Sequence, residues 1–216
     1  IYDDGHEISC HYNFHDNISK SNRKDFAHNL DEAIKIIKNI IGEKPLGFRA
    51  PNFAINSDNI WAYEELSSRF LYDSSYKTSL KISDLTKQKN FLYNNHKLEE
   101  FFIYEMPYIK NLLKIKSGGT FLRLFPSSVT ISSMNESYDM GHVPLLYLHP
   151  YELTLNHDFW IAWKDLSLLP FIKKLYIYCR QTQWSHLGHQ NLDKKIKHIC
   201  DNFEHQGPMK NLVLNK

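Results

Sequence analysis

The stretch Asp25–Pro51, DFAHNLDEAIKIIKNIIGEKPLGFRAP, decides the fold class of this 216-residue chain. Apolar residues recur in its first part at steps of three and four, namely at Ala27, Leu30, Ile34, Ile37 and Ile41. This periodicity predicts an amphipathic helix over residues 25–41, and Gly42 provides a stop signal. Residues 44–51 then predict a strand that enters a proline-constrained loop. A helix followed directly by a strand is typical of βαβ units and of a mostly parallel sheet or barrel.

The same alternation continues on both sides of this stretch. Residues 5–11 predict a short strand that runs into a loop, and Ser57-Asp58 predicts the cap of a helix over 58–69. Further strands are expected at residues 71–73, 100–106, 119–125 and 143–149, and helices at 127–137, 159–180 (interrupted by Pro170) and 192–203. We therefore expect an α/β fold.

Composition excludes several classes of protein. The chain is 42% hydrophobic and 23% charged with a formal net charge of +2, as in one ordinary soluble domain or two small ones. No uncharged apolar run reaches 18 residues, so we expect no membrane span. No concentrated basic run is present, so we expect no nucleic-acid partner. Its three cysteines are widely spaced without a CxxC pair, which argues against a disulfide scaffold or a thiolate zinc site, although one bridge stays open.

Four polar residues fall at the carboxyl ends of predicted strands: His11, Arg49, Asp73 and His149. In parallel α/β folds ligands bind at that edge, so their convergence is the main indication of a site.

Each candidate also has a plainer interpretation. His11 and His15 are four residues apart and could chelate one divalent metal, but a chance pair is expected among twelve histidines. Arg49, close before Pro51, could orient a carboxylate or a substrate oxygen, or it could be a surface arginine before a turn. His149 could be a general acid or base, or a hydrogen-bonded core histidine.

Taken together, four segments resemble the ordered motifs of one family. They are GHEISCHYNFH at 5–15, GFRAPN at 47–52, YDSS at 72–75 and LHPYEL at 148–153. In this order they resemble the polysaccharide deacetylases, the NodB-homology group or carbohydrate esterase family four. The branch associated with exopolysaccharide loci is most similar, since SGGTFLR at 117–123 and HLGH at 186–189 also have counterparts there.

The resemblance implies a distorted (β/α) barrel that removes acetyl groups from N-acetylated sugars of a polysaccharide or glycan. It also implies a divalent metal, usually zinc, that activates water together with a carboxylate base. His11 and His15 match the metal ligands, and Arg49 matches the arginine that orients the base. His149 matches the general acid, and Asp73 occupies the place of a carboxylate that tunes this histidine.

The family pattern also includes an upstream Asp-Asp pair that supplies the base and a third metal ligand. Asp3-Asp4 imitates this pair, but Asp4 lies only seven residues before His11, which is roughly 23 Å in an extended chain. We therefore interpret Asp3-Asp4 as part of a turn. We expect residues 1–216 to form a single, partial domain that lacks the first strand or strands, with 155–216 as a C-terminal helical extension. On this hypothesis the chain alone binds metal weakly and has little activity.

Two alternatives stay open. The first is a catalytically degenerate carbohydrate-binding relative, in which Tyr108, Trp160, Trp163 and Trp184 stack on sugar rings. The second is an amidase that acts on a non-sugar amide with the same barrel. Strand edges left unpaired in a partial barrel would favour a homo-oligomer. The expected compartment is a bacterial cytoplasm or cell envelope.

Overall fold

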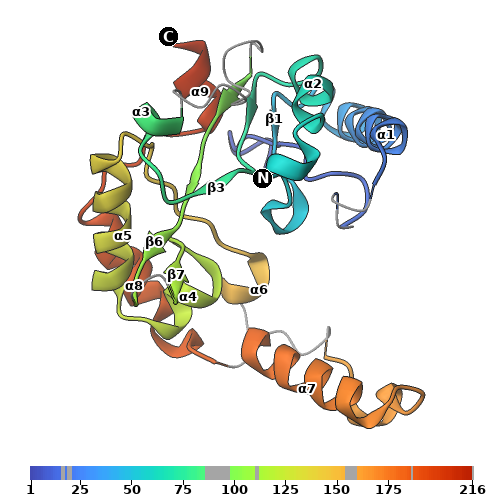
Figure 1. Ribbon diagram of the computed structural model, residues 1–216, viewed down its shortest axis with the longest axis vertical. Helices are drawn as coiled ribbons and strands as arrows, with labels where there is room; N and C mark the ends of the chain where they lie inside the picture. The colour runs from blue at the N-terminus through green and yellow to red at the C-terminus, as the bar shows by residue number, and fades with distance from the viewer. Residues whose placement is uncertain are drawn as a thin grey trace. The chain divides into compact units, whose positions relative to one another are not determined.

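The computed structural model describes residues 1–15, 18, 21–85, 98–109, 112–153, 160–185 and 187–215 (Figure 1). The chain divides into two compact units. The first unit comprises Ile1–Glu105, Ser137–Val143 and His205–Lys216, and the second comprises Met106–Glu136 and Pro144–Glu204. Helices and strands alternate along the chain, so the predicted α/β class is confirmed. Among the described residues, no helix is both long and apolar enough to cross a membrane.

The first long helix, α1, spans Arg23–Ile41, which confirms the predicted helix and extends it by two residues. It begins at Asn22, whose side chain accepts a hydrogen bond of 2.9 Å from the Asp25 amide. It ends at Gly42, which has a φ of 84°, in the left-handed region that glycine enters at low cost. Its buried face carries Phe26, Leu30 and Ala33.

A parallel sheet forms the centre of the first unit. Its strands are β1 (Gly47–Phe48), β2 (Tyr72–Asp73) and β4 (Glu99–Glu100), hydrogen-bonded in the order β1-β2-β4. The Cys10 segment adds to β1 in parallel, because the Cys10 amide donates to the Gly47 carbonyl at 2.9 Å and the Arg49 amide to the Cys10 carbonyl at 3.0 Å. Four successive parallel segments thus pair in chain order, as in the wall of a (β/α) barrel.

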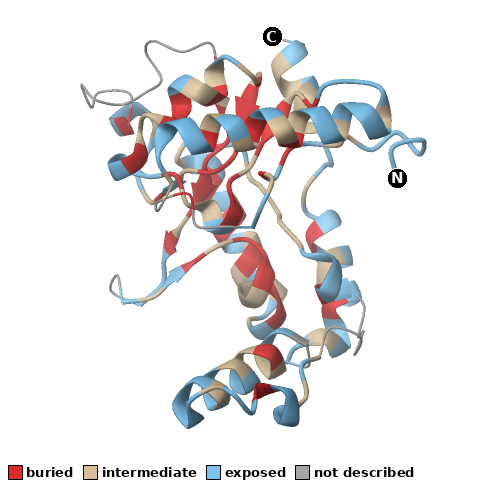
Figure 2. Cartoon of the chain, turned by 90° about the vertical axis from the view of Figure 1, so that its right-hand side faces the viewer, coloured by how far each residue is buried: buried red, intermediate tan, exposed pale blue. Residues whose placement is uncertain are grey.

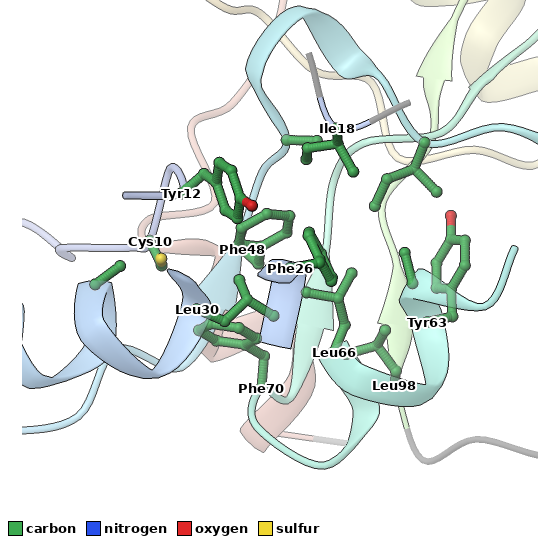
Figure 3. Close-up of a cluster of buried hydrophobic side chains, with 14 residues drawn as sticks. Cys10, Tyr12, Ile18, Phe26, Leu30, Phe48, Tyr63, Leu66, Phe70 and Leu98 are labelled. Carbon is green, nitrogen blue, oxygen red and sulfur yellow. The ribbon is translucent and has the colours of Figure 1, made fainter. Parts of the chain in front are cut away.

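The core of the first unit joins α1 to this sheet (Figure 3). The ring of Phe26 packs against those of Tyr12, Phe48 and Trp61, with centroids 5.5, 6.3 and 5.5 Å apart. Buried residues, drawn red in Figure 2, include both residues of β1 and both of β2. The segment that carries His11 is therefore fixed by Cys10 and Tyr12, which are both part of this cluster.

Close approach between β1 and β2 explains the glycine of the GFRAPN segment. Gly47 and Tyr72 are register partners, and a Cβ atom at position 47 would lie 1.9 Å from Cζ of the Tyr72 ring. Only a residue without a side chain fits there, so Gly47 sets how closely the two strands pack.

The helix predicted over 58–69 is divided in two. Ser57–Asn59 forms the 3₁₀ turn η3, and α2 follows at Ala62–Ser67. The cap is Asn56 rather than Ser57-Asp58. The Asn56 side chain accepts a hydrogen bond of 2.8 Å from the Asp58 backbone amide, and the Asn56 backbone amide donates to Asn59 Oδ1. Elsewhere in the first unit lie η2 (Pro51–Phe53), β3 (Lys77–Thr78), α3 (Ile82–Leu85), β5 (Ile103–Tyr104), which pairs in parallel with β3, and α9 (Met209–Leu214).

The second unit is mainly helical. It contains the antiparallel pair β6 (Met106–Pro107) and β7 (Lys114–Ile115), and the helices α4 (Gly119–Leu124), α6 (Pro150–Leu153), α7 (Phe171–Ser185) and α8 (Leu192–Cys200). Short 3₁₀ turns, η5 (Trp163–Leu166) and η6 (His189–Asn191), precede α7 and α8, and α5 spans Ser127–Asp139. The core of the second unit contains four buried residues, Leu122, Met134, Leu192 and Ile199.

Three local predictions for this region were wrong. Residues 119–125 form the helix α4 rather than a strand, because a short apolar run has no periodicity that separates a strand from a buried helical turn. Residues 143–149 contain one bridge, Tyr147 to Gly118, and Pro144 cannot donate to a ladder. The helix predicted over 159–180 begins only after Pro170 and runs to Ser185. Residue 159 lies outside the described residues.

Candidate active site

His11 is held by the backbone at the carboxyl end of β1. Its Nδ1 lies 2.7 Å from the carbonyl oxygen of Arg49, and it is exposed. A carbonyl oxygen only accepts, so Nδ1 carries the hydrogen and Nε2 keeps its lone pair when the ring is neutral. Metal-binding histidines are commonly oriented by such a bond to a backbone carbonyl. The environment of His11 therefore suits a ligand that binds through Nε2.

His15 lies next to His11, as the four-residue spacing predicts. The two ring centroids are 5.4 Å apart and the ring planes are inclined at 64°. Two imidazoles that share one tetrahedral zinc ion have centroids about 5 Å apart, given metal–nitrogen bonds of about 2.1 Å. The exposed pair therefore fits a divalent cation as two of its ligands. Among the described residues no group of three or more His, Cys, Asp or Glu side chains is placed to hold a metal ion.

The loop between the two histidines is anchored by a residue in an unusual conformation. Tyr12 has a φ of 68°, and its ring is buried against Phe26. Its hydroxyl oxygen accepts a bond of 3.2 Å from Asn29 of α1. A tyrosine in the left-handed region costs free energy that the surrounding packing must offset. Tyr12 is thus buried, while His11 and His15 on the same loop are exposed.

Arg49 is fixed by the segment that follows β2. Its Nε donates to the Ser74 carbonyl at 3.1 Å and its Nη2 to the Ser74 hydroxyl at 2.8 Å. Its guanidinium carbon also lies 5.8 Å from the centroid of the Phe53 ring. Asn52 and Phe53 have φ values of 58° and 52°, so this loop is also strained. The guanidinium group of Arg49 is therefore held in place by Ser74 and Phe53, and its functional role stays a prediction.

Asp73 is fully buried beneath this loop and pairs with a carboxyl that the sequence did not single out. Its register partner across β2 and β4 is Glu100. Asp73 Oδ1 accepts a 2.6 Å bond from the Ser75 hydroxyl, whose oxygen accepts a 2.7 Å bond from the Ala50 amide. Oδ2 is buried and has no hydrogen-bond partner among the described residues. This chain of bonds ties Asp73 to the Arg49 loop.

Burial controls the charge of this pair. It raises the pKa of Asp73 to about 6, although hydrogen bonds from Glu100 and Ser75 and the charge of Arg49 act in the opposite direction. Burial and the neighbouring Asp73 carboxylate raise the pKa of Glu100 well above its usual range. Glu100 Oε2 also accepts from the Tyr63 hydroxyl at 3.0 Å. Glu100 therefore holds the proton of the pair. No sequence signal pointed to Glu100, because nothing in its strand marks it as a residue of the site.

Asp3 and Asp4 lie in a turn, as interpreted from the sequence. The Gly5 amide donates to the Tyr2 carbonyl at 2.9 Å, and Asp4 pairs with the terminal ammonium group of Ile1. Both aspartates are exposed.

His149 belongs to the second unit, where it precedes the short helix α6. Its Nδ1 lies 3.3 Å from Oε2 of Glu152, and the same oxygen accepts a 2.9 Å bond from the His149 amide. The carboxylate beside His149 within this unit is thus Glu152, which sequence reasoning missed. Pro150 at the first helical position and Glu152 at the third are a helix-start signal that could have found it. That His149 meets the His11 pair remains a prediction, and His186 lies outside the described residues.

Comparison with known proteins connects the histidine loop and the Arg49 loop to one family. Residues 1–71, which contain His11, His15 and Arg49, match the family model described as polysaccharide deacetylase. Residues 1–71 are therefore similar to the polysaccharide deacetylases. The matched range contains the first two motifs of the deacetylase pattern, at 5–15 and 47–52.

Individual proteins are also similar to parts of this chain. A peptidoglycan deacetylase-like protein of Gibberella zeae is 35% identical over 75 residues, which are 35% of this chain and 22% of that protein. The chain thus spans about a fifth of this deacetylase-like relative. Among solved structures, a Mycobacterium smegmatis protein described as a polysaccharide deacetylase aligns with 92% of this chain and 65% of its own, at 16% identity and a TM-score of 0.44. Puue allantoinase aligns with 95% and 62%, at 12% identity and a TM-score of 0.41. Structural likenesses at these TM-scores are too weak to establish a shared site.

Proposed function

We propose that this protein hydrolyses N-acetyl groups of a polysaccharide or glycan, with a divalent metal, most simply zinc, held by His11 and His15. The single observation that carries the proposal is the exposed His11–His15 pair, whose ring separation of 5.4 Å suits one shared ion, within a segment of deacetylase sequence. A metal bound there supplies Lewis acidity toward the acetyl carbonyl and toward water. The remaining chemistry belongs to the side chains of the protein.

Each residue then has a defined task. The Arg49 carbonyl keeps Nδ1 of His11 protonated, so Nε2 is the ring nitrogen that would bind the metal. The Arg49 guanidinium, fixed by Ser74, is a cation beside the histidine loop that orients the carboxylate base. His149 holds a proton for the departing amine. In the reaction, water gives a proton to the carboxylate base as its oxygen joins the acetyl carbon, the C–N bond breaks, acetate leaves, and the amine takes the proton of His149.

Asp73 has a structural task in this proposal rather than contact with substrate. It is fully buried, and its bonds run through Ser75 to the backbone after Arg49. We therefore assign to Asp73 and Glu100 the shaping of the Arg49 loop.

Release of acetate tests the function. The protein, supplied with zinc, is incubated with N-acetylglucosamine oligomers and, separately, with cyclic amides, and acetate and ring-opened product are measured. The wild-type rate should be low because residues 1–216 offer two metal ligands, and acetate release that falls to background in His11→Gln supports the proposal. The matched control, His28→Gln on the exposed face of α1, should retain full activity.

Other outcomes decide between the alternatives. Ring opening of cyclic amides without acetate release would favour the amidase. Binding of the oligomers without hydrolysis would favour the carbohydrate-binding relative. In that case the partly exposed rings of Trp163 and Trp184 are the surfaces to test, although Lys174 and Arg180 already cover one face of each ring.

A further inference from the structure

The imidazole of His149 is bonded to a carboxylate of its own unit. Oε2 of Glu152 lies 3.3 Å from His149 Nδ1 and accepts the His149 amide hydrogen at 2.9 Å. The ring of Tyr151 stacks on the imidazole, with centroids 5.0 Å apart and planes inclined at 19°. Two side chains from α6 therefore define both the position and the tilt of the ring. The other edge is free to face outward, since 47% of the His149 side chain is exposed.

Glu152 is itself held in place by a buried cation. Its side chain is fully buried, and Arg123 Nε donates to Oε1 at 3.0 Å. Arg123 is also buried, and its Nη1 donates to the carbonyl oxygens of Gln183, Trp184 and Leu187, at 2.8, 3.1 and 3.0 Å. Paired buried charges with further hydrogen bonds keep one geometry, because every alternative leaves a charge uncompensated.

The helix that carries Arg123 is also fixed. Lys195 of α8 donates to the carbonyl oxygens of Leu122, Arg123 and Phe125 at the end of α4, at 2.7–3.0 Å. These carbonyls have no partner within the helix, so the ammonium group satisfies them. The support of His149 thus extends from α6 through Arg123 to α8.

Glu152 is ionised in this environment. Burial acts to raise its pKa, but the hydrogen bonds from His149 and Arg123 outweigh burial and lower the pKa below its usual value. A carboxylate only accepts hydrogen bonds, so the facing nitrogen of His149 must be the donor. Nδ1 therefore carries a hydrogen in both the neutral and the charged ring, and proton exchange is left to Nε2.

We propose that Glu152 is the positioning residue of His149: it fixes the ring with Nδ1 protonated and Nε2 presented outward, and Arg123 locks Glu152 in that role. The inference rests on the proposed function for its catalytic meaning, since Nε2 is then the atom that delivers the proton to the departing amine. Its structural content, one tautomer of one histidine, is independent of any activity.

The tautomer is measured by ¹⁵N–¹H correlation spectra of the histidine rings in the full chain at about pH 8, where an ordinary histidine is neutral. The spectrum of His149→Gln assigns the signal among the twelve histidines. We expect His149 in the Nδ1–H form, with the nitrogen shift of Nε2 typical of an unprotonated ring nitrogen. A wild-type His149 in the Nε2–H form would overturn the proposal, and this result needs no variant of Glu152.

Glu152→Gln supplies the second arm. The amide can either accept or donate, so the Nδ1–H form should lose its dominance and the Nε2–H form should appear. An unchanged tautomer in a folded Glu152→Gln chain would overturn the proposal. Glu32→Gln is the matched control, because Glu32 makes only a 4.0 Å surface pair with Lys35, and it should leave the His149 signals unchanged.

Kinetics separate this inference from the proposed function. If the wild type releases acetate, Glu152→Gln should lower kcat by about 10- to 100-fold with KM within about twofold, as for loss of an oriented acid–base group. A fall in activity that only follows the folded fraction would reduce Glu152 to a structural residue and overturn the proposal. If the wild type releases no acetate, the proposed function fails, whereas the tautomer measurement still decides the role of Glu152.

Discussion

Asp73 and Glu100 are direct partners across the parallel strands β2 and β4, and their two buried carboxyl groups share a hydrogen bond. Such a bond needs one proton between two acids. The same pair supports the backbone of the Arg49 loop through Ser75 and so links the core of the sheet to the candidate site.

This pair makes stability depend on pH. Unfolded carboxyls lose their protons near pH 4, whereas burial raises the pKa of Asp73 to about 6 and that of Glu100 well above its usual value. The folded state therefore binds more protons, and rising pH lowers the free energy of unfolding. We expect a loss on the order of 2 kcal/mol for Asp73 between about pH 4 and pH 6, measured by urea unfolding.

Glu100→Gln should remove the part of this dependence that belongs to Glu100, because an amide does not titrate, whereas burial keeps the pKa of Asp73 raised. The neighbouring substitution Glu99→Gln is the control, since Glu99 lies on the opposite face of the strand. A slope as steep in Glu100→Gln as in the wild type would contradict the assignment of the shared proton.

Removal of one member of the Arg123–Glu152 pair should destabilise the second unit. Arg123→Met leaves the Glu152 charge buried without its arginine partner, at a cost of about 3 kcal/mol or more. In the double variant Arg123→Met/Glu152→Met no charge is left unpaired, so its loss should be clearly smaller than the sum of the single losses. Denaturant unfolding monitored by tryptophan fluorescence measures all four proteins, and strict additivity would refute the coupling.

Zinc affinity should depend on both histidines of the His11–His15 pair. We expect the chain of residues 1–216 to bind zinc weakly, because two imidazoles are fewer than the three protein ligands of catalytic zinc sites. His11→Gln and His15→Gln should each weaken binding by at least about tenfold in isothermal calorimetry. His28→Gln should have no effect. Tight binding that survives both substitutions would place the metal elsewhere.

Gly47→Ala should destabilise the first unit through steric overlap with Tyr72. The added methyl group would lie 1.9 Å from a ring atom, so the strands must separate or the ring must shift. Overpacking of this kind costs about 1–3 kcal/mol. Gly42→Ala is the comparison, because position 42 has open space around it and pays only for its φ of 84°, about 1 kcal/mol. A smaller loss at position 47 than at position 42 would contradict the steric explanation.

Much of the first unit could be predicted because its signals are local. Helix α1 follows from apolar spacing, the Gly42 stop from the conformational freedom of glycine, and strand β2 from a short apolar run before Asp73. The placement of His11, Arg49 and Asp73 at the same edge of the sheet also followed, because parallel strands in chain order bring their carboxyl ends together. The second unit was less predictable, since α4 and the Val143–His149 segment have apolar runs that suit either state.

By itself the sequence determined the periodic helices, the chain order of the parallel segments and the spacing of the histidines. It also determined the similarity of residues 1–71 to polysaccharide deacetylases. These depend on neighbours within a few residues or on the order of motifs. Tertiary structure alone decided that Glu100 shares a proton with Asp73 and that Arg123 fixes Glu152 beside His149. Pairing of groups 27 and 29 residues apart, respectively, depends on burial, which strengthens interactions between charged and polar groups only after the chain has excluded water around them.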